Sequence, residues 1–174
     1  MKTAIVTGSA DGLGADIARA LSEKNYRVGV LDVRAELADR TASGLKNAIA
    51  LHADVTDADQ VESAFKKFSD TPDLMVNNAG IVRFGPLEEQ TVEDYSSVIS
   101  VNLLGSCICA RQASQGMLER GSGHIINITS VNGIHPSPNV GLYSGTKAAM
   151  ANMTQAMSIE WGPRGLRVNA IAPG

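Results

Sequence analysis

The sequence predicts an α/β fold, a doubly wound parallel sheet with helices on both faces. Three observations predict it. Short apolar runs alternate along the 174 residues with segments whose apolar residues recur at helical spacing. The short runs are apolar throughout, which is typical of strands that are buried on both faces. Parallel neighbours also need crossover connections, and the intervening helical segments supply them.

The first half of the chain is expected to form three pairs of a strand and a helix. A short β-branched run, TAIVT, leads into glycines and then into a segment where Leu13, Ile17, Ala20 and Leu21 repeat at helical spacing. The same two patterns recur twice. The expected elements are strand 3–7, helix 13–25, strand 27–32, helix 35–43, strand 48–52 and helix 57–68.

The second half continues the alternation, so that six strands alternate with five helices. Pro136 and Pro138 mark a loop within this series, and neither an internal repeat nor a linker interrupts it. We therefore expect a single domain over residues 1–174. The remaining expected elements are strand 74–78, a long helical region at 91–119, strand 124–129, helix 142–161 and strand 166–172.

The composition is that of a globular protein and excludes several functions. Hydrophobic residues make up 44% of the chain and charged residues 19%, and the net charge is −3. Lysines and arginines are scattered among acids, so no nucleic-acid surface is expected. No apolar run approaches the ~20 residues of a membrane span, and a strand close to the N-terminus leaves no room for a signal peptide. A cytoplasmic protein without membrane contact is expected.

The histidines and cysteines form no metal-binding pattern. His52, His124 and His135 are isolated along the chain. Cys107 and Cys109 are two positions apart in a predicted helix, so their side chains point to roughly opposite sides. This spacing predicts neither a shared metal nor a disulfide, and both cysteines are expected to fill space in the core.

The first turn, TGSADGLG, predicts a site for a dinucleotide. Gly8, Gly12 and Gly14 follow a strand and open a helix, where backbone can approach a ligand and free N–H groups attract a diphosphate. Glycines there can also serve the turn alone. Asp32 strengthens the first interpretation, because it ends the second strand 18 positions after Gly14, where a carboxylate can accept both hydroxyls of an adenosine ribose.

The charges around this turn predict a preference for NAD over NADP. Asp32 would repel a 2′-phosphate, and Asp11 would add to the repulsion if it faces the same pocket. Asp11 could instead be the N-cap of the following helix. Arg34 points the other way, because it could pair with a 2′-phosphate; a basic residue in this position is more often simply solvated.

The stretch LYSGTKAAM places Tyr143 and Lys147 four residues apart on one face of a predicted helix. Alone, the pair has an ordinary surface contact as its alternative. Its surroundings are more specific, because TGSADGLG, NNAG at 77–80, Asn102 in VNLLG, Ser130 in NITSVNG, YSGTK and the final PG occur in this order. In these motifs and their mutual spacing the whole chain resembles the short-chain dehydrogenase/reductase family, in its ordinary dehydrogenase type, with a Rossmann-like fold.

The resemblance implies four catalytic residues. Tyr143 would be the general acid/base, giving its phenolic proton to a carbonyl oxygen or taking one from an alcohol. Lys147 would stabilise the phenolate and hold the nicotinamide ribose, and Ser130 would hydrogen-bond the substrate oxygen. Asn102 would hold a water that links Lys147 to solvent. The alternatives are a turn-capping hydroxyl for Ser130 and a helix-kink residue for Asn102.

The resemblance also implies the contacts to the cofactor. Asp54 would accept from the exocyclic amine of adenine beside Val55, or else only shape a turn. Asn78, Ala79 and Gly80 would lie along the adenosine ribose, or form a tight turn. Val82, Phe84 and His135 fall in segments that line the substrate pocket, although His135 is expected at the surface. The full set of expected cofactor-binding residues is Gly8, Asp11, Gly12, Leu13, Gly14, Asp32, Asp54, Val55, Asn78, Ala79, Gly80, Tyr143, Lys147, Pro173 and Gly174.

The expected function is hydride transfer between NAD and a secondary alcohol or ketone. The alternatives are an NADPH-dependent 3-oxoacyl-thioester reductase and a catalytically silent dinucleotide-binding protein. The resemblance implies a homo-tetramer or homo-dimer that pairs the helices at 91–119 and 142–161. It also implies that a substrate-covering segment and a further strand follow RVNAIAPG, so a C-terminal truncation at Gly174 is expected.

Overall fold

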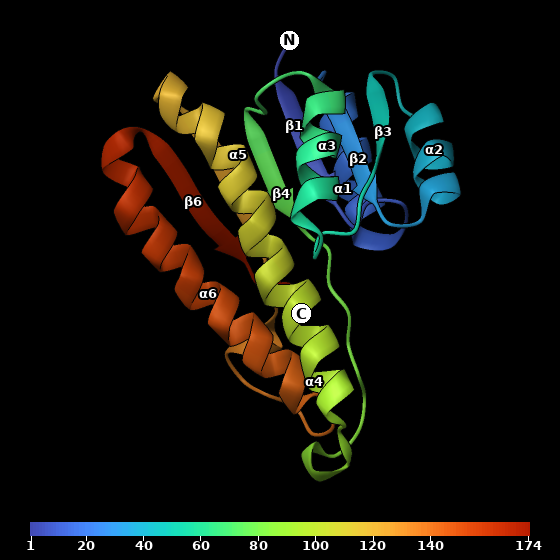
Figure 1. Ribbon diagram of the computed structural model, residues 1–174, viewed down its shortest axis with the longest axis vertical. Coiled ribbons are helices and arrows are strands. Elements are labelled where there is room, and N and C mark those ends of the chain that lie inside the picture. The colour runs from blue at the N-terminus through green and yellow to red at the C-terminus, as the bar shows by residue number, and fades with distance from the viewer.

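A computed structural model describes all of residues 1–174, and its centre is a sheet of six parallel strands (Figure 1). The strand order is β3-β2-β1-β4-β5-β6, and every neighbouring pair is parallel. This confirms the predicted fold class, with strand ends within one residue of the predicted ones. The strands are β1 (Thr3–Thr7), β2 (Arg27–Asp32), β3 (Ala48–His52), β4 (Leu74–Asn77), β5 (Gly123–Ile128) and β6 (Leu166–Ile171).

Helices cover both faces of the sheet and bury two separate apolar clusters. The smaller cluster packs α1 (Gly12–Glu23) and α2 (Ala35–Ser43) against one face. The larger packs α3 (Ala58–Phe68), α5 (Ser106–Arg120) and α6 (Gly141–Trp161) against the other. Successive strand residues point to opposite faces, so Ile5 joins the larger cluster and Val6 the smaller. This double burial explains why the strands are apolar throughout.

The helical region predicted at 91–119 is interrupted in the middle. It consists of α4 (Val92–Ile99), a π-helical turn (Ser100–Gly105) and α5. Thr91 and Asp94 form a reciprocal capping box that fixes the start of α4. Figure 1 shows α4 and the loop before it extending past the carboxyl edge of the sheet, beside the start of α6. The π-helical turn contains Asn102, and such turns commonly kink helices, which fits the alternative role considered for this residue.

The helix predicted at 13–25 is confirmed as α1, but its large apolar residues are not the ones that are buried against the sheet. Leu13 and Ala20 are exposed, and the buried positions are Gly14, Ala15, Ala18 and Ser22. Ile17 and Leu21 pack only partly against the smaller cluster. The helix approaches the sheet through small residues, because its first turn lies directly over the loop that follows β1.

The strand order places one crevice at the carboxyl edge of the sheet. From β1 the chain proceeds to β2 and β3 on one side, and then crosses to β4, β5 and β6 on the other. In such sheets the crevice where the order reverses is the usual ligand site. The loops after β1 and β4 flank this point. None of the helices combines the length and the apolar composition needed to cross a bilayer.

Candidate cofactor and active site

The loop between β1 and α1 requires glycine for two different reasons. Gly8 and Gly12 have φ of 60° and 53°, in the left-handed region that other residues avoid. Gly14 has no space for a side chain, since a Cβ would lie 2.2 Å from the carbonyl oxygen of Gly8. The backbone is thereby free to approach a ligand, and the N-terminus of α1 offers N–H groups to an anion.

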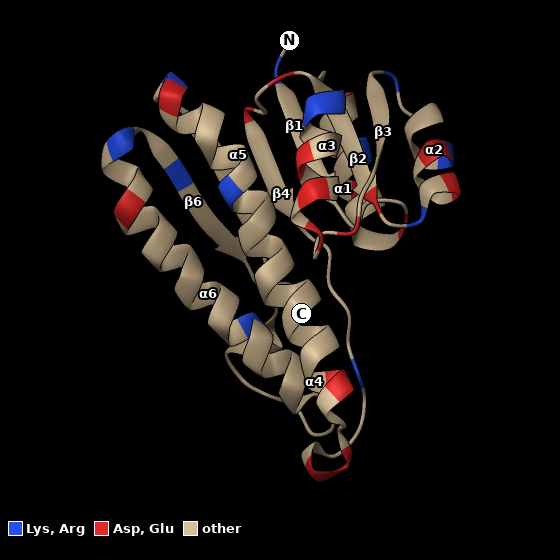
Figure 2. Ribbon diagram, viewed as in Figure 1, with Lys and Arg blue, Asp and Glu red and all other residues tan.

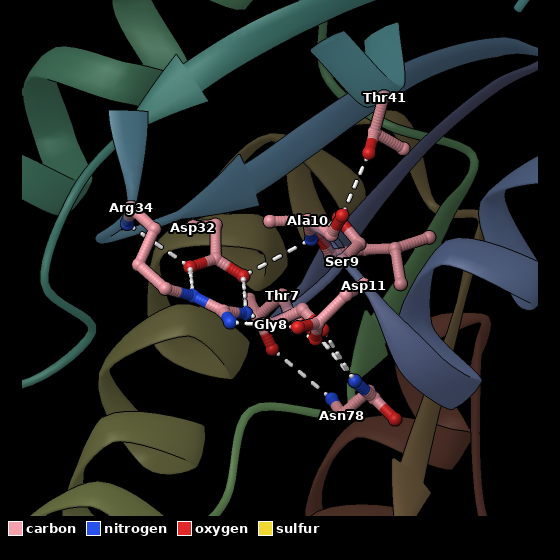
Figure 3. A network of polar contacts seen from close by, with 10 residues as sticks. Thr7, Gly8, Ser9, Ala10, Asp11, Asp32, Arg34, Thr41 and Asn78 are labelled. Atoms are coloured by element: carbon pink, nitrogen blue, oxygen red, sulfur yellow. Dashed lines mark hydrogen bonds and ion pairs between the residues drawn. The ribbon is translucent and has the colours of Figure 1, made fainter. Parts of the chain in front are cut away.

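Asn78 holds this glycine loop in place, a role that the sequence did not reveal. Its Nδ2 donates to the carbonyl oxygens of Thr7 and Gly8, both at 3.0 Å, as Figure 3 shows. The hydroxyl of Thr7 in turn accepts from the backbone N–H of Asn78 and of Ala79. Thr41 donates from α2 to the carbonyl of Ala10. In the sequence, the only signals for this role of Asn78 are a threonine at the end of a buried strand and two adjacent asparagines.

Asp32 lies at the end of β2, with 4% of its surface exposed, and all its acceptor positions are used (Figure 3). Its Oδ2 accepts from the N–H of Ala10 at 3.0 Å, and its Oδ1 from the N–H of Arg34 at 3.0 Å. The Arg34 side chain adds bonds from Nε at 3.1 Å and Nη2 at 3.2 Å. Hydrogen bonds to the charged form keep a buried carboxylate ionised.

The structure corrects the expectation for Arg34 and decides between the two roles considered for Asp11. Arg34 is not simply solvated, because its guanidinium forms a bridge from Asp32 to Asp11, with bonds of 2.7 and 3.0 Å to the latter. Asp11 is at the N-cap position of α1, but its side chain accepts no hydrogen bond from the helix. It faces the same pocket as Asp32 instead. The planar fork of an arginine fits two carboxylates at once, which orients Arg34 between Asp32 and Asp11.

The bridge keeps all three groups charged. Hydrogen bonds from Arg34 lower the pKa of Asp11. Burial raises the pKa of Asp32, but bonds from Arg34 and Ala10 outweigh that effect, and its pKa lies below the usual value. The two carboxylates raise the pKa of Arg34.

The first cavity fits the adenosine half of a dinucleotide. Its volume is about 430 Å³, and it lies between the loops after β1, β2, β3 and β4. Asp54 faces this cavity. Its Oδ1 accepts hydrogen bonds from the N–H and the hydroxyl of Thr56 and so shapes a turn. Its Oδ2 makes no hydrogen bond within the protein. The predicted cofactor residues that line this cavity are Gly8, Asp11, Asp32, Asp54, Val55, Ala79 and Gly80.

A second cavity, of about 250 Å³, lies beside the first and shares Gly80 with it. It brings together three of the four predicted catalytic residues and both C-terminal residues of the predicted set. Their elements are β5 and its following turn, the start of α6 and the segment after β6. The predicted residues that line it are Leu13, Asn78, Gly80, Ser130, Tyr143, Lys147, Pro173 and Gly174.

Lys147 is a buried cation without an anionic partner. Only 4% of its surface is exposed, and its Nζ donates to the carbonyl oxygen of Ile128 at 2.7 Å. The same Nζ lies 5.5 Å from the ring centroid of Tyr143, one helical turn earlier. Burial lowers the pKa of Lys147 to about 8. The ammonium is therefore available to a phenolate or to ligand hydroxyls in this cavity.

Ser130 contributes a hydroxyl group to the same cavity. Its Oγ accepts from the N–H of Asn132 at 3.1 Å, which is the turn-capping bond expected as its alternative role. The hydroxyl proton is not used in that bond. Ser130 can therefore cap the turn and donate to a substrate oxygen at the same time.

Asn102 does not line either cavity, and its side chain is fully occupied. Its Oδ1 accepts from the N–H of Ile81 at 2.8 Å, and its Nδ2 donates to the Ile81 carbonyl and to the hydroxyl of Thr146. The amide thus joins the loop after β4 to α6. Only the backbone carbonyl remains for a water; it accepts from Ser106 Oγ and has a second lone pair. Gly12, Val82, Phe84 and His135 also lie outside the residues that line the two cavities.

Comparison with known proteins gives one consistent family. A model of the family described as short chain dehydrogenase matches residues 2–174. The cis-4-hydroxycyclohexanecarboxylate dehydrogenase of Sinomonas cyclohexanicum is 38% identical, and the match covers 99% of this chain and 72% of that protein.

Solved structures give the same result. A 3-oxoacyl-[acyl-carrier protein] reductase from Brucella melitensis with bound NAD has a TM-score of 0.95 at 34% identity, covering 99% of this chain and 70% of that one. A protein from Beutenbergia cavernae, described as an NAD(P)-dependent gluconate 5-dehydrogenase with NADP at low occupancy, has a TM-score of 0.91 at 34% identity, with 99% and 72% covered. These similar structures contain either NAD or NADP.

Proposed function

The chain belongs to the short-chain dehydrogenase family of NAD(P)-dependent oxidoreductases, and on this basis we propose that it transfers a hydride between NAD and a secondary alcohol or ketone. One observation carries the proposal. Lys147 is buried without a carboxylate, beside Tyr143 and in the same cavity as the Ser130 hydroxyl. A buried ammonium without an anionic partner destabilises a fold, so its position is explained by chemistry in the cavity.

The residues present fit a dinucleotide. The left-handed glycines and the close approach at Gly14 make room for a diphosphate at the N-terminus of α1. Asp32 would provide a buried carboxylate for the two ribose hydroxyls once the Arg34 side chain leaves it, and Asp54 Oδ2 is available to the adenine amine. Near Tyr143 and Lys147, the backbone of Gly80, Pro173 and Gly174 would hold the nicotinamide end. When bound, the cofactor supplies C4 of nicotinamide as the hydride acceptor or donor.

Tyr143 carries the proton in the proposed reaction. During reduction its phenolic O–H donates to the carbonyl oxygen as negative charge develops there, and during oxidation the phenolate accepts the proton of the alcohol. Ser130 Oγ–H donates to the same oxygen and stabilises the developing charge. The Lys147 ammonium favours the phenolate by Coulomb attraction, which is strong because the site is buried. A water on the Asn102 backbone carbonyl would link Lys147 to solvent, delivering a proton after reduction and removing one after oxidation.

NAD is the proposed cofactor because of charge. A 2′-phosphate would lie against the buried carboxylate of Asp32, with Asp11 close by, and like charges in this environment repel. Arg34 reduces the repulsion, but it already bonds to both carboxylates. Its guanidinium is therefore only partly available to a phosphate.

Two alternatives remain distinct from this proposal. An NADPH-dependent 3-oxoacyl-thioester reductase is favoured by the similar reductase from Brucella melitensis, although that structure contains NAD. A silent dinucleotide-binding protein is disfavoured, since nucleotide binding alone requires neither the phenol of Tyr143 nor the Ser130 hydroxyl.

For assembly we propose a homo-tetramer or homo-dimer. The support is the set of exposed apolar side chains along α4, the π-helical turn and α6, namely Ile99, Leu104, Met153 and Ile159.

Initial rates test the proposal. The purified protein is supplied with NAD or NADP and a panel of secondary alcohols, and with NADH or NADPH and a panel of ketones that includes a 3-oxoacyl thioester. We expect a kcat/KM for NAD at least about tenfold above that for NADP, from the loss of one to two charge-assisted hydrogen bonds. A clear preference for NADPH with the thioester would support the alternative reductase. Cofactor binding without turnover of any compound would support the silent protein.

A further inference from the structure

Two loops adjoin the cavity that contains Tyr143 and Ser130 without lining it, and we name residues 81–91 and 131–140 the entrance loops. They are joined to each other, because the N–H of Gly85 donates to the carbonyl of Asn139 at 2.9 Å. The side chain of Leu87 packs on Gly141, two residues before Tyr143. Val131 follows Ser130 directly, and its N–H donates to the carbonyl of Pro173 at 3.0 Å. Both loops therefore lie next to the segments that carry Ser130 and Tyr143, and the non-reacting part of a substrate held by these two residues can extend onto them.

The entrance loops expose large apolar side chains. Phe84 is 76% exposed and Ile134 66% exposed, and Leu87 and Val131 are also exposed. Single exposed apolar residues are common on any protein, but these four lie on two connected loops beside one cavity, and we call them the apolar rim. Binding of an apolar ligand against this rim is favourable because it removes apolar surface from water, whereas contact with a charged group brings no such gain.

The charged residues of this region are almost all acidic. Residues 81–99 contain four acids, Glu88, Glu89, Glu93 and Asp94, and one base, Arg83. The base is neutralised, since its Nε lies 3.5 Å from Asp94 Oδ1. Figure 2 shows the same arrangement, with acidic ribbon at the turn before α4 and at its start, and one basic stretch in the loop.

The second entrance loop offers no compensating cation. Residues 131–146 contain no lysine, arginine, aspartate or glutamate. Lys147 is the only base that lines the cavity, and it bonds to the Ile128 carbonyl behind Tyr143. A carboxylate or phosphate on the substrate would meet no lysine or arginine in the entrance loops other than Arg83, and would face net negative charge there.

We infer that the substrate is an uncharged alcohol or ketone whose non-reacting part is apolar, and that anionic substrates are disfavoured. This inference rests on the proposed function. It distinguishes the chain from its relative named for cis-4-hydroxycyclohexanecarboxylate, because that compound is an anion at neutral pH. It likewise disfavours substrates with a gluconate-like carboxylate or an acidic carrier.

A matched pair of ketones tests the inference. Cyclohexanone and 4-oxocyclohexanecarboxylate differ only by one carboxylate, and kcat/KM is measured for each with NADH at low and high ionic strength. We expect cyclohexanone to be preferred by about tenfold or more at low salt. Added salt should raise kcat/KM for the carboxylate several-fold by screening, and leave cyclohexanone unchanged.

Two variants of the entrance loops assign the effect to named residues. Neutralising the acids in Glu88→Gln/Glu89→Gln should raise kcat/KM for the carboxylate about threefold and leave that for cyclohexanone unchanged. Phe84→Ser should lower kcat/KM for 4-methylcyclohexanone about fivefold without changing NADH affinity. Preference for the carboxylate, or equal effects of the acid variant on both ketones, would overturn the inference and leave the proposed function intact. If neither these ketones nor any other is reduced, the proposed function itself is wrong.

Discussion

The guanidinium of Arg34 binds both carboxylate oxygens of Asp32, with Nε 3.1 Å from Oδ1 and Nη2 3.2 Å from Oδ2. Backbone N–H groups of Ala10 and Arg34 use the remaining acceptor positions. A ribose diol can therefore reach Asp32 only if the Arg34 side chain moves away. Cofactor binding at this end of the pocket would replace the two side-chain hydrogen bonds from Arg34 to Asp32 by two hydrogen bonds from the ribose hydroxyls. The displaced guanidinium can remain hydrogen-bonded to Asp11.

Replacing Asp32 tests this exchange. Asp32→Asn retains the size of the side chain and removes its charge, so NAD loses charge-assisted bonds of about 1.5–3 kcal/mol. We expect kcat/KM for NAD to fall about tenfold or more, and that for NADP to stay constant or rise because the repulsion disappears. Asp16→Asn, on the exposed side of α1, is the matched control and should change neither value. An equal loss for both cofactors would show that Asp32 does not discriminate between them.

The stability of the cofactor-free protein should increase with pH between about 8 and 10.5 because of Lys147. Its pKa is about 8 in the fold and near ~10.5 when unfolded, so in this window the unfolded chain binds more protons and stability rises. Below pH ~8 both states are protonated and the contribution is constant. The full gain is at most about 3 kcal/mol.

Urea unfolding at several pH values measures this effect. Lys147→Met fills the same space without a charge, and its free energy of unfolding should lack the rise. If the free energy of unfolding rose with pH equally in the wild type and in Lys147→Met, the assignment of the rise to this residue would be refuted.

Gly14→Ala should disrupt the cofactor loop. The added Cβ would lie 2.2 Å from the Gly8 carbonyl oxygen, and backbone must shift to admit it. We expect a loss of about 1–3 kcal/mol in stability and NAD binding weakened by more than about tenfold. Gly145→Ala in α6 is the control, since no atom lies within 4 Å of its Cβ position, and it should stabilise the helix by roughly 0.5–1 kcal/mol. Calorimetric unfolding and NAD titration of both variants provide the test; similar behaviour of the two would contradict it.

A buried polar chain attaches α6 to the sheet, and its removal should reduce stability. Asn77 donates to Asn127 at 2.8 Å, and Asn127 donates to Thr154 of α6 at 2.9 Å. Thr154→Val keeps the shape but leaves the Asn127 donor unpaired, which costs about 1–3 kcal/mol. Urea midpoints should fall accordingly, whereas Ser43→Ala at the exposed end of α2 should change stability by less than about 0.5 kcal/mol. If Thr154→Val left the urea midpoint unchanged, water or a shifted amide would have to satisfy the Asn127 donor.

The fold could be predicted from the sequence because its signals are local. An apolar, β-branched run of five residues favours a buried strand. Helices between such runs then favour a parallel sheet. The glycine turn was predicted as a place where backbone approaches a ligand, and the positive φ of Gly8 and Gly12 is a further reason for glycine that the structure adds. The spacing of the apolar residues predicted the helix α1 correctly, but it does not show that Gly14 and Ala18 are the residues buried against the sheet.

The site was predictable as a set of residues and not as a set of contacts. Ser130, Tyr143 and Lys147 meet in one cavity, but the partners of Arg34 and Asn78 depend on how distant segments approach each other. Arg34 reaches Asp11 from 23 residues away, and Asn78 reaches Gly8 from 70. The side chain of Asn102 is used by Ile81 and Thr146, which no spacing along the chain indicates.

Turnover and NAD affinity of Tyr143→Phe test the central claim most directly. The change removes only the phenolic oxygen, so the account predicts turnover at least about hundredfold below wild type, with the Kd for NAD within about threefold. Tyr26→Phe, at the start of β2 and far from the cavity, should behave as wild type. Turnover by Tyr143→Phe at the wild-type rate would contradict the assignment of Tyr143 as the general acid/base.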